Sequence, residues 1–556
     1  MENIIKVFCE NTSSPIEVEM GTTLGEICAQ LAIPNEYPFL AAYVNNRIKE
    51  LNYKVYTPIS IRFVDATDFE GYRVYQRSVS FILQTAIWAL YPHKAFHIRQ
   101  SIGDGFYCEI EGLETLTEAD CARIEEKARE IVAADLRIER TKLPTDEVVA
   151  CFEHFGFDDK IALLRTRQRL YSNIYRLGDM VGYFFGALAP STGYIDAFEV
   201  RPYYNGFYLA LPARKTPGKV AATPQSDKMF TIFQQYHFWV ELMGVPTIGH
   251  VNQKVLQGET GELIKVAEAV HERHLSQIAD KIYAANAERG VKLVLISGPS
   301  SSGKTTTAKR LGIQLRLLGL QPALISLDDY FVNRDQTPRD KDGKLDYEAL
   351  EAIDLARLND DLHRLAAGES VDIPRYDFIT GTRQVRNEPL KLGERSILVM
   401  EGIHGLNPRL TPGIPDSIKF KIYVSCFTSV AMDNVTRIAT TDNRLLRRLV
   451  RDYRTRGNGA IDTLSRWASV RRGEEQHIFP YQENADVMFN SSLFYEISVL
   501  RALAEPILRE IPDTVPEYGE ASRLLKFLNN FSPIAPDEIP PTSILREFIG
   551  GSSFRY

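Results

Sequence analysis

Three short apolar runs stand out between residues 292 and 400 of this chain, at residues 292–297, 323–327 and 396–400. Each run is continuous rather than alternating, which is typical of strands that are buried on both faces of a parallel sheet. Residues 304–318, between the first two runs, place apolar side chains at helical spacing: Ala308, Leu311, Leu315 and Leu318. This succession of strand, helix and strand predicts an α/β domain with a parallel sheet.

The first 64 residues show a different pattern. Residues 4–8 form an apolar run, and residues 15–20 alternate between apolar and polar side chains. Both features are typical of strands. A helix is predicted for residues 23–31 with Thr22 or Thr23 as its cap, and short strands are predicted near residues 41–44 and 60–64. The pattern predicts a small β-rich module.

Residues 65–230 mix helical and strand patterns and predict an α+β domain, with helices at 75–90, 118–134 and 145–155 and strands at 106–109 and 206–211. The polar, proline-containing stretch 212–227 marks a boundary. Residues 231–290 are predicted to be a helical connector and residues 291–513 the α/β domain. The prolines after residue 514 predict an irregular strap over residues 514–556.

Composition narrows the class of protein. A chain of 556 residues exceeds what one hydrophobic core supports. The net charge of -7 gives no overall nucleic-acid signature. The six cysteines are scattered, which argues against a disulfide framework and against a cysteine zinc site. There is no secretory leader pattern and no long apolar run, so we expect a cytoplasmic protein without a membrane span.

A phosphate-binding loop joins the first strand to its helix. Residues 298–305 read Gly-Pro-Ser-Ser-Ser-Gly-Lys-Thr and fit the pattern G-x-x-x-x-G-K-[ST]. In such a loop backbone N–H groups surround the phosphates, the lysine reaches the β- and γ-phosphates, and the hydroxyl binds Mg²⁺. We therefore expect ATP or GTP, with Mg²⁺, to bind at Gly298, Pro299, Ser300, Ser301, Ser302, Gly303, Lys304, Thr305 and Thr306.

Two later strands end in acidic residues. Asp328 follows the second apolar run and Glu401 follows the third. Ligands of open α/β sheets lie at the carboxyl ends of strands, where Asp328 could deprotonate a substrate hydroxyl and Glu401 could hold Mg²⁺ beside Thr305. A loop or helix-cap carboxylate is an equal alternative for either residue alone. Their order after a phosphate-binding loop favours the functional interpretation.

An arginine-rich segment predicts a lid. Four arginines share one helical face by their spacing: Arg444, Arg447, Arg448 and Arg451. Guanidinium groups pair with phosphate oxygens, and a closing lid excludes water. A solvated basic helix and an RNA-contacting patch are the alternatives.

This half of the chain resembles the uridine kinase and phosphoribulokinase family of P-loop kinases, over about residues 291–495. The matching residues include Ser326-Leu-Asp-Asp-Tyr-Phe331, Leu345-Asp-Tyr347, Pro374-Arg-Tyr-Asp-Phe378, Arg383, Met400-Glu-Gly402, Arg447–Asp452, Arg456-Gly457 and Ala485-Asp486. The resemblance implies Asp328 as catalytic base, assisted by Lys304 and Arg451. It also implies a lid over the phosphates formed by Arg448, Arg451 and Arg456, and acceptor contacts by Asp346, Tyr376, Phe378, Arg383 and Arg448.

The match to uridine kinases weakens at the groups that read the base. A histidine of the family falls on Gly381, a pocket arginine on Asn458 and a glutamine on Arg466. Phosphoryl transfer is therefore better supported than pyrimidine specificity, because a pocket built from hydrogen bonds changes its substrate when those groups change.

The front of the chain resembles threonyl-tRNA synthetases over about residues 1–200. Residues 21–24 and 42–46 are similar to a TGS β-grasp module, and residues 104–107 and 190–193 to the editing domain. The family's metal-binding and catalytic positions fall on Arg77, Phe81, Phe184 and Leu188, and phenylalanine and leucine neither bind a metal nor move a proton. His93 and His97 share a ligand-like spacing, but Pro92 makes a helix there doubtful.

The expected fold is therefore α/β: a P-loop kinase domain with a parallel sheet, preceded by a β-grasp TGS module and an α+β domain similar to the synthetase editing domain. We expect an ATP-dependent nucleoside kinase that phosphorylates a ribose 5′-hydroxyl. The alternatives are a nucleotide-dependent RNA- or tRNA-binding regulatory protein without turnover, and a phosphoribulokinase-like sugar-phosphate kinase. A tRNA deacylase is disfavoured. The partners are then a nucleoside or sugar acceptor and RNA at the front half, and a homo-oligomer is left open.

Overall fold

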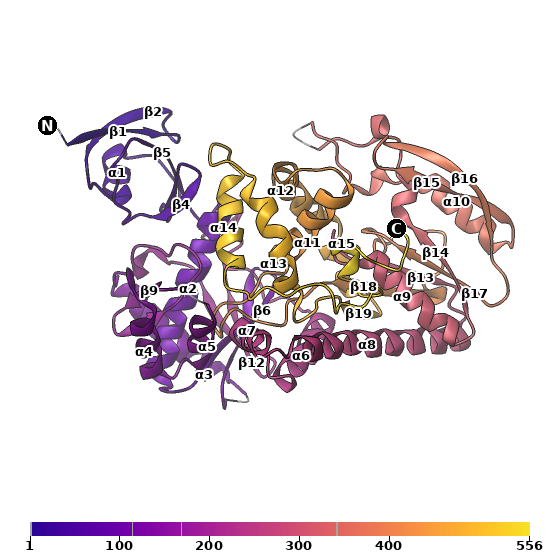
Figure 1. The fold of residues 1–556 in the computed structure, drawn as a ribbon, viewed down its shortest axis with the longest axis horizontal. Helices are drawn as coiled ribbons and strands as arrows, with labels where there is room; N and C mark the ends of the chain where they lie inside the picture. The colour runs from indigo at the N-terminus through magenta and orange to yellow at the C-terminus, as the bar shows by residue number, and fades with distance from the viewer. Residues whose placement is uncertain (1–2, 114, 168, 341–342) are drawn as a thin grey trace.

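The computed structural model describes residues 3–113, 115–167, 169–340 and 343–556 (Figure 1). The N-terminal module lies at one end of the molecule and the parallel sheet toward the other, with a C-terminal helix between them. The predicted fold class is confirmed, since the later half contains a parallel sheet flanked by helices.

The first module is a five-stranded sheet with one helix packed on it. Its sheet order is β2-β1-β5-β3-β4, and β1 and β5 run parallel. Thr23 caps the helix, because its hydroxyl accepts a hydrogen bond from the Glu26 N–H while the Glu26 carboxylate accepts one from the Thr23 N–H. The elements are β1 (Ile4–Cys9), β2 (Ser14–Glu19), α1 (Leu24–Leu31), β3 (Ala41–Val44), β4 (Arg47–Glu50) and β5 (Ile59–Val64).

The second region carries two antiparallel sheets, ordered β11-β12-β7-β6 and β10-β9-β8. Its first helix begins at Phe69 rather than at the predicted Tyr75, because the Asp68 side chain accepts a hydrogen bond from the Glu70 N–H and caps the helix there. The elements are α2 (Phe69–Leu90), β6 (Phe96–Ile102), β7 (Gly105–Ile110), α3 (Glu118–Ala133), β8 (Glu139–Pro144), α4 (Thr145–Phe155), α5 (Asp158–Thr166), β9 (Tyr171–Leu177), β10 (Met180–Gly182), β11 (Glu199–Tyr203) and β12 (Gly206–Ala210).

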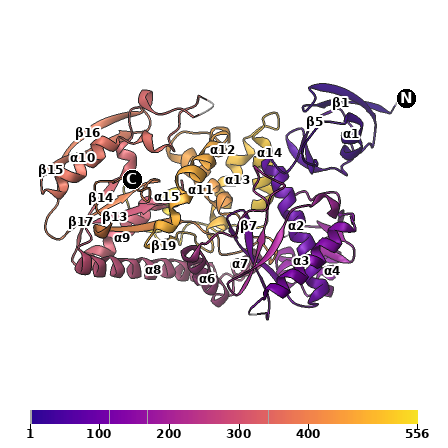
Figure 2. The ribbon, with the colours of Figure 1, turned by 180° about the vertical axis from the view of Figure 1, so that it is seen from behind.

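Three helices connect the two halves: α6 (Asp227–Leu242), α7 (Ile248–Leu256) and α8 (Thr260–Arg289). The long helix α8 runs along one side of the molecule toward the sheet, as both ribbon views show (Figures 1 and 2). It packs against α9 and β19 through buried side chains that recur along one face, including Leu263, Ala267, Leu275, Ile278 and Ile282.

The parallel sheet has the order β14-β17-β13-β18-β19, with every pair of neighbouring strands parallel. The carboxyl ends of the strands therefore share one edge, where ligands of open α/β sheets bind. A separate antiparallel hairpin, β15–β16, lies outside this sheet. The elements are β13 (Leu293–Ser297), α9 (Lys304–Leu317), β14 (Gln321–Ser326), α10 (Leu355–Ala366), β15 (Ser370–Asp377), β16 (Thr382–Lys391), β17 (Ser396–Glu401), β18 (Lys419–Ser425), α11 (Thr440–Thr455), α12 (Ala460–His477), β19 (Val487–Asn490) and α13 (Glu496–Arg509).

The strap after residue 514 is more regular than predicted. It contains α14 (Tyr518–Leu528) and the short α15 (Arg546–Ile549). Helix α14 forms because the prolines lie outside it, and its buried side chains Ala521, Leu524, Phe527 and Leu528 fall on one face. The proline signal was correct only for the segments that flank this helix.

A network of charged side chains ties the front half to the later half. Arg523 on α14 donates to both carboxylate oxygens of Asp442 on α11, each at 2.8 Å. Arg523 also donates to Glu520 Oε2 at 2.8 Å, and Arg73 on α2 lies 3.3 Å from the same oxygen. Three elements that are distant in sequence thus share one set of ion pairs.

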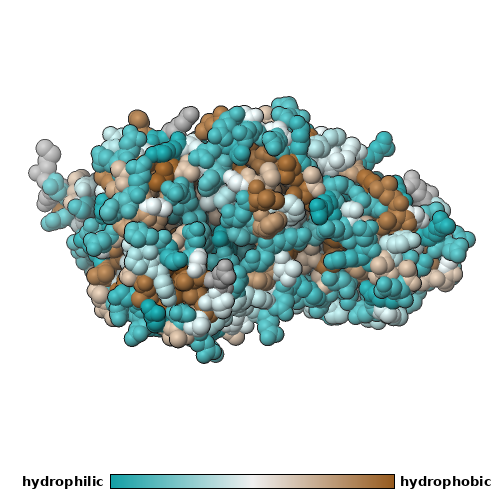
Figure 3. Space-filling model, turned by 90° about the horizontal axis from the view of Figure 1, so that it is seen from below, coloured by the Kyte–Doolittle hydropathy of each residue, from teal (hydrophilic) through white to brown (hydrophobic). Residues whose placement is uncertain are grey.

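Helices among the described residues are each too short or too polar to cross a membrane. The face seen from below in Figure 3 is mostly hydrophilic, with apolar patches scattered over it.

We predict that Glu520→Gln destabilises the chain in a pH-dependent way. Burial alone would raise the pKa of Glu520, but Arg523 and Arg73 outweigh it and hold that pKa at about 2. A depressed folded-state pKa adds stability above the unfolded value near 4.5 and loses it as pH falls toward 2. At pH 7 the variant should unfold at a lower temperature, with a loss of roughly 1–3 kcal/mol.

The measurement is thermal unfolding of both chains from pH 7 down to pH 3, where the difference should shrink. Glu288→Gln, which changes an exposed glutamate of α8, is the matched control. A difference that stays constant or grows toward low pH would contradict the assignment.

Candidate active site

The loop between β13 and α9 has a backbone that two glycines make possible. A Cβ atom on Gly298 would lie 1.9 Å from the carbonyl oxygen of Val424, so the loop approaches β18 too closely for any side chain. Gly303 has a φ of +84°, which L-residues rarely adopt. Lys304 begins α9 directly after it. The predicted phosphate-binding loop therefore stands between a parallel strand and a helix, the context that its sequence pattern requires.

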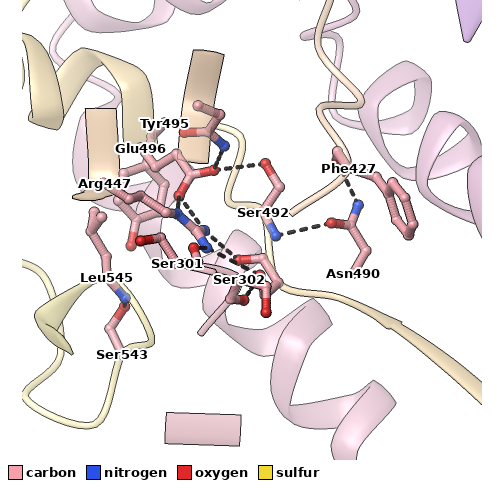
Figure 4. Close-up of polar contacts among 12 residues, drawn as sticks. Ser301, Ser302, Phe427, Arg447, Asn490, Ser492, Tyr495, Glu496, Ser543 and Leu545 are labelled. Atoms are coloured by element: carbon pink, nitrogen blue, oxygen red, sulfur yellow. Dashed lines mark hydrogen bonds and ion pairs between the residues drawn. The ribbon is translucent and has the colours of Figure 1, made fainter. Parts of the chain in front are cut away.

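The loop carbonyls are held from outside. Arg444 Nη1 donates to the Ser300 carbonyl at 3.2 Å, and Arg447 Nη1 donates to the Ser301 carbonyl at 3.4 Å. The Ser491 hydroxyl donates to the Ser302 carbonyl, and Figure 4 shows this cluster around Arg447. Carbonyls that are bonded on one side leave N–H groups free to face the other, as anion-binding loops require.

Buried carboxylates fix both arginines. Arg444 forms a two-point pair with Glu474 on α12, and one of its hydrogen bonds, from Nη2 to Oε2, measures 2.7 Å. Arg447 Nε donates to Glu496 Oε2 at 2.9 Å at the start of α13. All four side chains are almost fully buried. Two of the four arginines predicted to share a lid face are thus tied into the interior.

The hydroxyl and the carboxylate predicted to hold a metal lie together. Thr305 Oγ1 donates to Glu401 Oε1 at 3.1 Å, and Ser326 Oγ donates to the same oxygen at 2.9 Å. Burial and the nearby Asp328 carboxylate raise the pKa of Glu401 to about 7, against the lowering effect of Lys304. The Thr305 hydroxyl oxygen and the Glu401 carboxylate oxygens are the kind of ligand that Mg²⁺ prefers, and they meet at the start of α9.

Asp328 follows β14 at the same edge of the sheet. It lies near enough to Glu401 and Glu348 to raise the pKa of both carboxyls, and Lys304 lowers both of those pKa values. Lys304 Nζ also donates to the Pro299 carbonyl at 3.2 Å. The structure therefore gathers Lys304, Asp328 and Glu401 into one electrostatic cluster beside the loop.

Three arginines of the predicted lid meet at one buried aspartate. Arg451 donates to Asp452 Oδ1 through two nitrogens, at 2.9 and 2.7 Å. Arg448 Nε lies 3.2 Å from Asp452 Oδ2, and Arg456 Nε lies 3.7 Å from Oδ1. Arg448 Nη1 reaches the loop and donates to Ser300 Oγ at 3.1 Å. Asp452 thus groups the arginines, and Arg448 already touches the phosphate-binding loop.

Aromatic rings gather at the predicted acceptor site. The ring of Tyr376 lies 5.6 Å from Phe331 and 5.2 Å from Phe378, measured between centroids. Tyr347 lies 6.3 Å from Phe331. The Arg456 guanidinium stands 5.1 Å above the ring of Phe378, which is 43% exposed. These rings pack edge to face, and the exposed ring of Phe378 lies next to the arginine cluster.

Glu348, two residues after Asp346, lies near Lys304 and Arg448, since both act on its pKa. Asp346 Oδ1 accepts a hydrogen bond from the Glu348 N–H at 3.0 Å. Burial and Glu474 raise the pKa of Glu348 to about 7, although Arg448 and Lys304 act against them. The Glu348 Oε2 atom is buried without a hydrogen-bond partner. Sequence reasoning missed Glu348, because nothing separates it locally from an ordinary surface glutamate.

Arg383 and Gly381, two positions near the predicted acceptor site, are both shaped by contacts within the chain. Arg383 Nη1 donates to Asp354 Oδ2 at 2.9 Å and Nη2 donates to the Phe331 carbonyl at 3.2 Å, so this guanidinium fixes the loop after Asp328. Gly381 has a φ of +72°, and a Cβ there would lie 2.5 Å from Arg334 Nε. A histidine at this position would displace Arg334.

Thr306, the last predicted loop contact, is bonded within the chain. Its N–H donates to Glu547 Oε2 at 3.2 Å, and its hydroxyl donates to the same atom at 2.6 Å. Sequence reasoning could not find Glu547, because it lies 241 residues from Thr306.

The positions that carry hydrolysis in synthetase editing domains are filled with packing groups. Phe81 and Phe184 lie 5.2 Å apart between ring centroids, and both are buried with Leu188. Arg77 Nε donates to the Ala187 carbonyl at 3.0 Å. His97 lies on β6 and His93 in the turn before it, so the two histidines do not share a helix face. The side chains at these four positions therefore make packing contacts and one hydrogen bond to the backbone.

Comparison with known proteins confirms the first resemblance. Residues 293–497 match the model of the Phosphoribulokinase / Uridine kinase family. The solved structure of a possible uridine kinase from Bacillus stearothermophilus is 22% identical to this chain and covers 39% of it and 98% of its own length, with a TM-score of 0.28.

The second resemblance is also confirmed. A threonine–tRNA ligase of Clostridium kluyveri is 30% identical over 198 residues, which are 35% of this chain and 31% of the ligase. The ligase of a Geobacter species is 26% identical over 208 residues, covering 37% of this chain and 33% of its own. The chain thus spans about a third of the length of these curated relatives.

We predict that Arg447→Lys removes hydrogen bonds that support the phosphate-binding loop on the side away from the nucleotide. Lysine cannot reproduce the branched contacts of Arg447 with Glu496, Ser491 and the loop. Breaking a buried pair leaves a carboxylate uncompensated, so we expect a loss of about 2–4 kcal/mol in stability and at least about tenfold weaker ATP binding. Thermal unfolding and calorimetric titration with Mg·ATP measure the two effects.

Arg316→Lys is the matched control, because Arg316 is an exposed arginine on α9. It should leave both quantities unchanged. An Arg447→Lys chain with normal stability and normal ATP affinity would show that the arginine does not support the loop.

Proposed function

We propose that the P-loop kinase domain at residues 293–497, a domain of the Phosphoribulokinase / Uridine kinase family, transfers the γ-phosphoryl group of ATP to the 5′-hydroxyl of a nucleoside. The observation that carries this proposal is the position of Asp328. Its carboxylate lies at the ligand-binding edge of the sheet, in the same electrostatic cluster as Lys304 and Glu401. A carboxylate there is within reach of a substrate hydroxyl presented to the terminal phosphate.

The reaction follows from the charges around the loop. The backbone N–H groups of the loop, except at Pro299, which has none, and the Lys304 ammonium hold the phosphates. Asp328 accepts the proton of the acceptor hydroxyl while the oxygen of that hydroxyl forms a bond to the γ-phosphorus. The bond from that phosphorus to the β,γ-bridging oxygen breaks, and ADP leaves. Arg448, which reaches the loop, and Arg451, which shares Asp452 with it, would neutralise charge on the transferred group.

A divalent ion would be held by Thr305 Oγ1 and, directly or through water, by the Glu401 carboxylate, and it would offset the charge of the β- and γ-phosphates. Ser326 positions the Glu401 oxygen through its hydroxyl. The chain itself supplies only these few oxygens, as is usual where phosphate oxygens and water complete the coordination of Mg²⁺.

The acceptor site favours a flat, hydroxyl-bearing molecule. The exposed ring of Phe378, supported by the buried rings of Phe331 and Tyr376, suits a base, and Arg456 lies over that ring. Asp346 suits the ribose hydroxyls. Because Arg334 fills the space beside Gly381, we expect the base to be read differently than in uridine kinases. A sugar phosphate is the alternative acceptor, and the arginines would favour its charge.

The front half supports a second, compatible role in RNA contact. Its likeness to threonine–tRNA ligases carries this proposal, together with the loss of the hydrolytic groups at Phe81 and Phe184. We expect tRNA binding that weakens as salt rises, without deacylation.

We predict that Asp328→Asn lowers the rate of phosphoryl transfer at least about a thousandfold and changes ATP affinity less than about threefold. The amide keeps the size of the side chain but cannot accept the proton. ADP release, measured across nucleosides and small sugar phosphates, identifies the acceptor and gives the rate. Asp335→Asn is the matched control, because Asp335 is an exposed aspartate of the same loop.

Product must also be identified, since ADP release alone could reflect hydrolysis. A phosphorylated acceptor formed by the natural chain and absent with Asp328→Asn supports the proposal. Equal rates for the two chains, or nucleotide and RNA binding without any phosphorylated acceptor, would reject it in favour of a nucleotide-dependent RNA-binding protein.

A further inference from the structure

The C-terminal strap, residues 514–556, reaches both the first module and the phosphate-binding loop. Asn46 Nδ2 donates to the Asp513 carbonyl at 3.0 Å just before the strap, and the Arg47 guanidinium stands 4.8 Å above the ring of Tyr518. In Figure 1 α14 lies beside this module, whereas α15 lies near α9. One segment therefore contacts both ends of the molecule.

The far end of the strap is bonded to the start of α9. The Thr306 N–H and hydroxyl both donate to Glu547 Oε2, at 3.2 and 2.6 Å. The Tyr556 hydroxyl lies 2.8 Å from Thr306 Oγ1, and Lys309 Nζ stands 5.7 Å from the ring of Tyr556. Two side chains of the strap thus meet at one residue of the nucleotide site.

Apolar side chains seat this part of the strap. Ile544, Leu545 and Phe548 are fully buried. Phe548 packs 5.0 Å from the Arg447 guanidinium, and Figure 4 shows Ser543 and Leu545 beside that arginine. A Cβ on Gly303 would lie 2.6 Å from Ile544 Cγ2. The strap therefore packs directly against the outside of the loop, and Glu547 is not an incidental surface contact.

The Thr306 N–H, which donates to Glu547, belongs to the anion-binding end of α9. The N–H of Thr306 is in the first turn, where N–H groups have no partner within a helix. That end of a helix favours negative charge, and in this loop pattern it faces phosphates. Lys304 and Thr305 precede Thr306 in the same turn. The Glu547 carboxylate therefore stands where a phosphate oxygen would bind.

Charge makes the two occupants exclusive. The two bonds to Thr306 place the Glu547 carboxylate beside this site, and its charge contributes to the raised pKa of Glu401. A nucleotide brings several negative charges to the loop. A retained carboxylate would repel it and would keep the Thr306 donors occupied.

We propose that the strap is an internal competitor of the nucleotide: Glu547, supported by Tyr556, must release Thr306 before the α-phosphate and its neighbours can bind. The other end of the strap stays attached, because α14 contacts Arg47 and shares the Asp442–Arg523 pair. The inference rests on the nucleotide-binding part of the proposed function and not on phosphoryl transfer.

The expected size of the effect follows from competition. When a segment of the chain occupies the site, the apparent dissociation constant for ATP equals the intrinsic constant divided by the fraction of molecules whose site is open. If the strap is seated in about nine molecules of ten, unseating it tightens ATP binding about tenfold.

The test is calorimetric titration of the full chain with Mg·ATP. Glu547→Gln should tighten ATP binding about five- to tenfold, because an amide keeps the shape but loses the charge. Tyr556→Phe should tighten it about two- to threefold. Asp537→Asn, which removes an exposed carboxylate of the same strap, should match the natural chain. Adding Lys304→Ala to Glu547→Gln should abolish binding and thereby place it at the loop.

Hydrogen exchange of residues 544–556 provides the second measurement. Saturating Mg·ATP should increase exchange there in the natural chain, and Glu547→Gln should show increased exchange without ATP. Unchanged or weakened ATP affinity in Glu547→Gln, or protection of residues 544–556 by ATP, would overturn the inference and make the strap a wall of the nucleotide site.

Turnover measured on the same samples separates this inference from the proposed reaction. Tighter ATP binding without a phosphorylated acceptor supports the competitor and rejects the kinase. Unchanged binding with normal turnover rejects the competitor and leaves the kinase standing. Absence of ATP binding in every variant rejects both.

Discussion

The buried pair between Arg447 and Glu496 is the interaction on which the nucleotide site depends. The loop must turn its N–H groups toward phosphate, and this requires its carbonyls to find partners on the opposite side. Arg447 and Ser491 supply those partners, and Glu496 balances the charge. A bare buried arginine would cost too much free energy, so the loop conformation and the start of α13 are one structural unit.

The site in front of the loop carries an excess of carboxylates that only cations can balance. Burial raises the pKa values of Glu348 and Glu401, the Asp328 carboxylate adds to this rise, and Lys304 acts against it. Such a cluster suits a site that takes up a proton and holds a divalent ion, because its charge state responds to what binds. Arg448 and Arg451, grouped by Asp452, bring positive charge to the same part of the domain.

The sequence predicted the parts of the site whose signals are local. The loop, its flanking strand and helix, and the acidic ends of β14 and β17 were predicted because each lies within a few residues of an apolar run. The partners of the arginines were not, since Glu474 and Glu496 lie on later helices and only the fold brings them to Arg444 and Arg447. Helix spacing alone therefore placed four arginines on one lid face. In the structure Arg444 and Arg447 are buried, whereas Arg448 and Arg451 gather at Asp452.

The front half is held together and joined to the later half by contacts between residues that are distant in sequence. Arg77 and the Phe81–Phe184 pair stand at positions where threonine–tRNA ligases are expected to carry editing groups, and here they make packing contacts and a hydrogen bond. A region kept only as a solubilising appendage would not need the buried charges that join α2, α11 and α14. Those ion pairs favour one orientation of the two halves, because separating them would strand several charges with no partner. The front half is therefore best understood as the fixed anchor from which the strap reaches the nucleotide site.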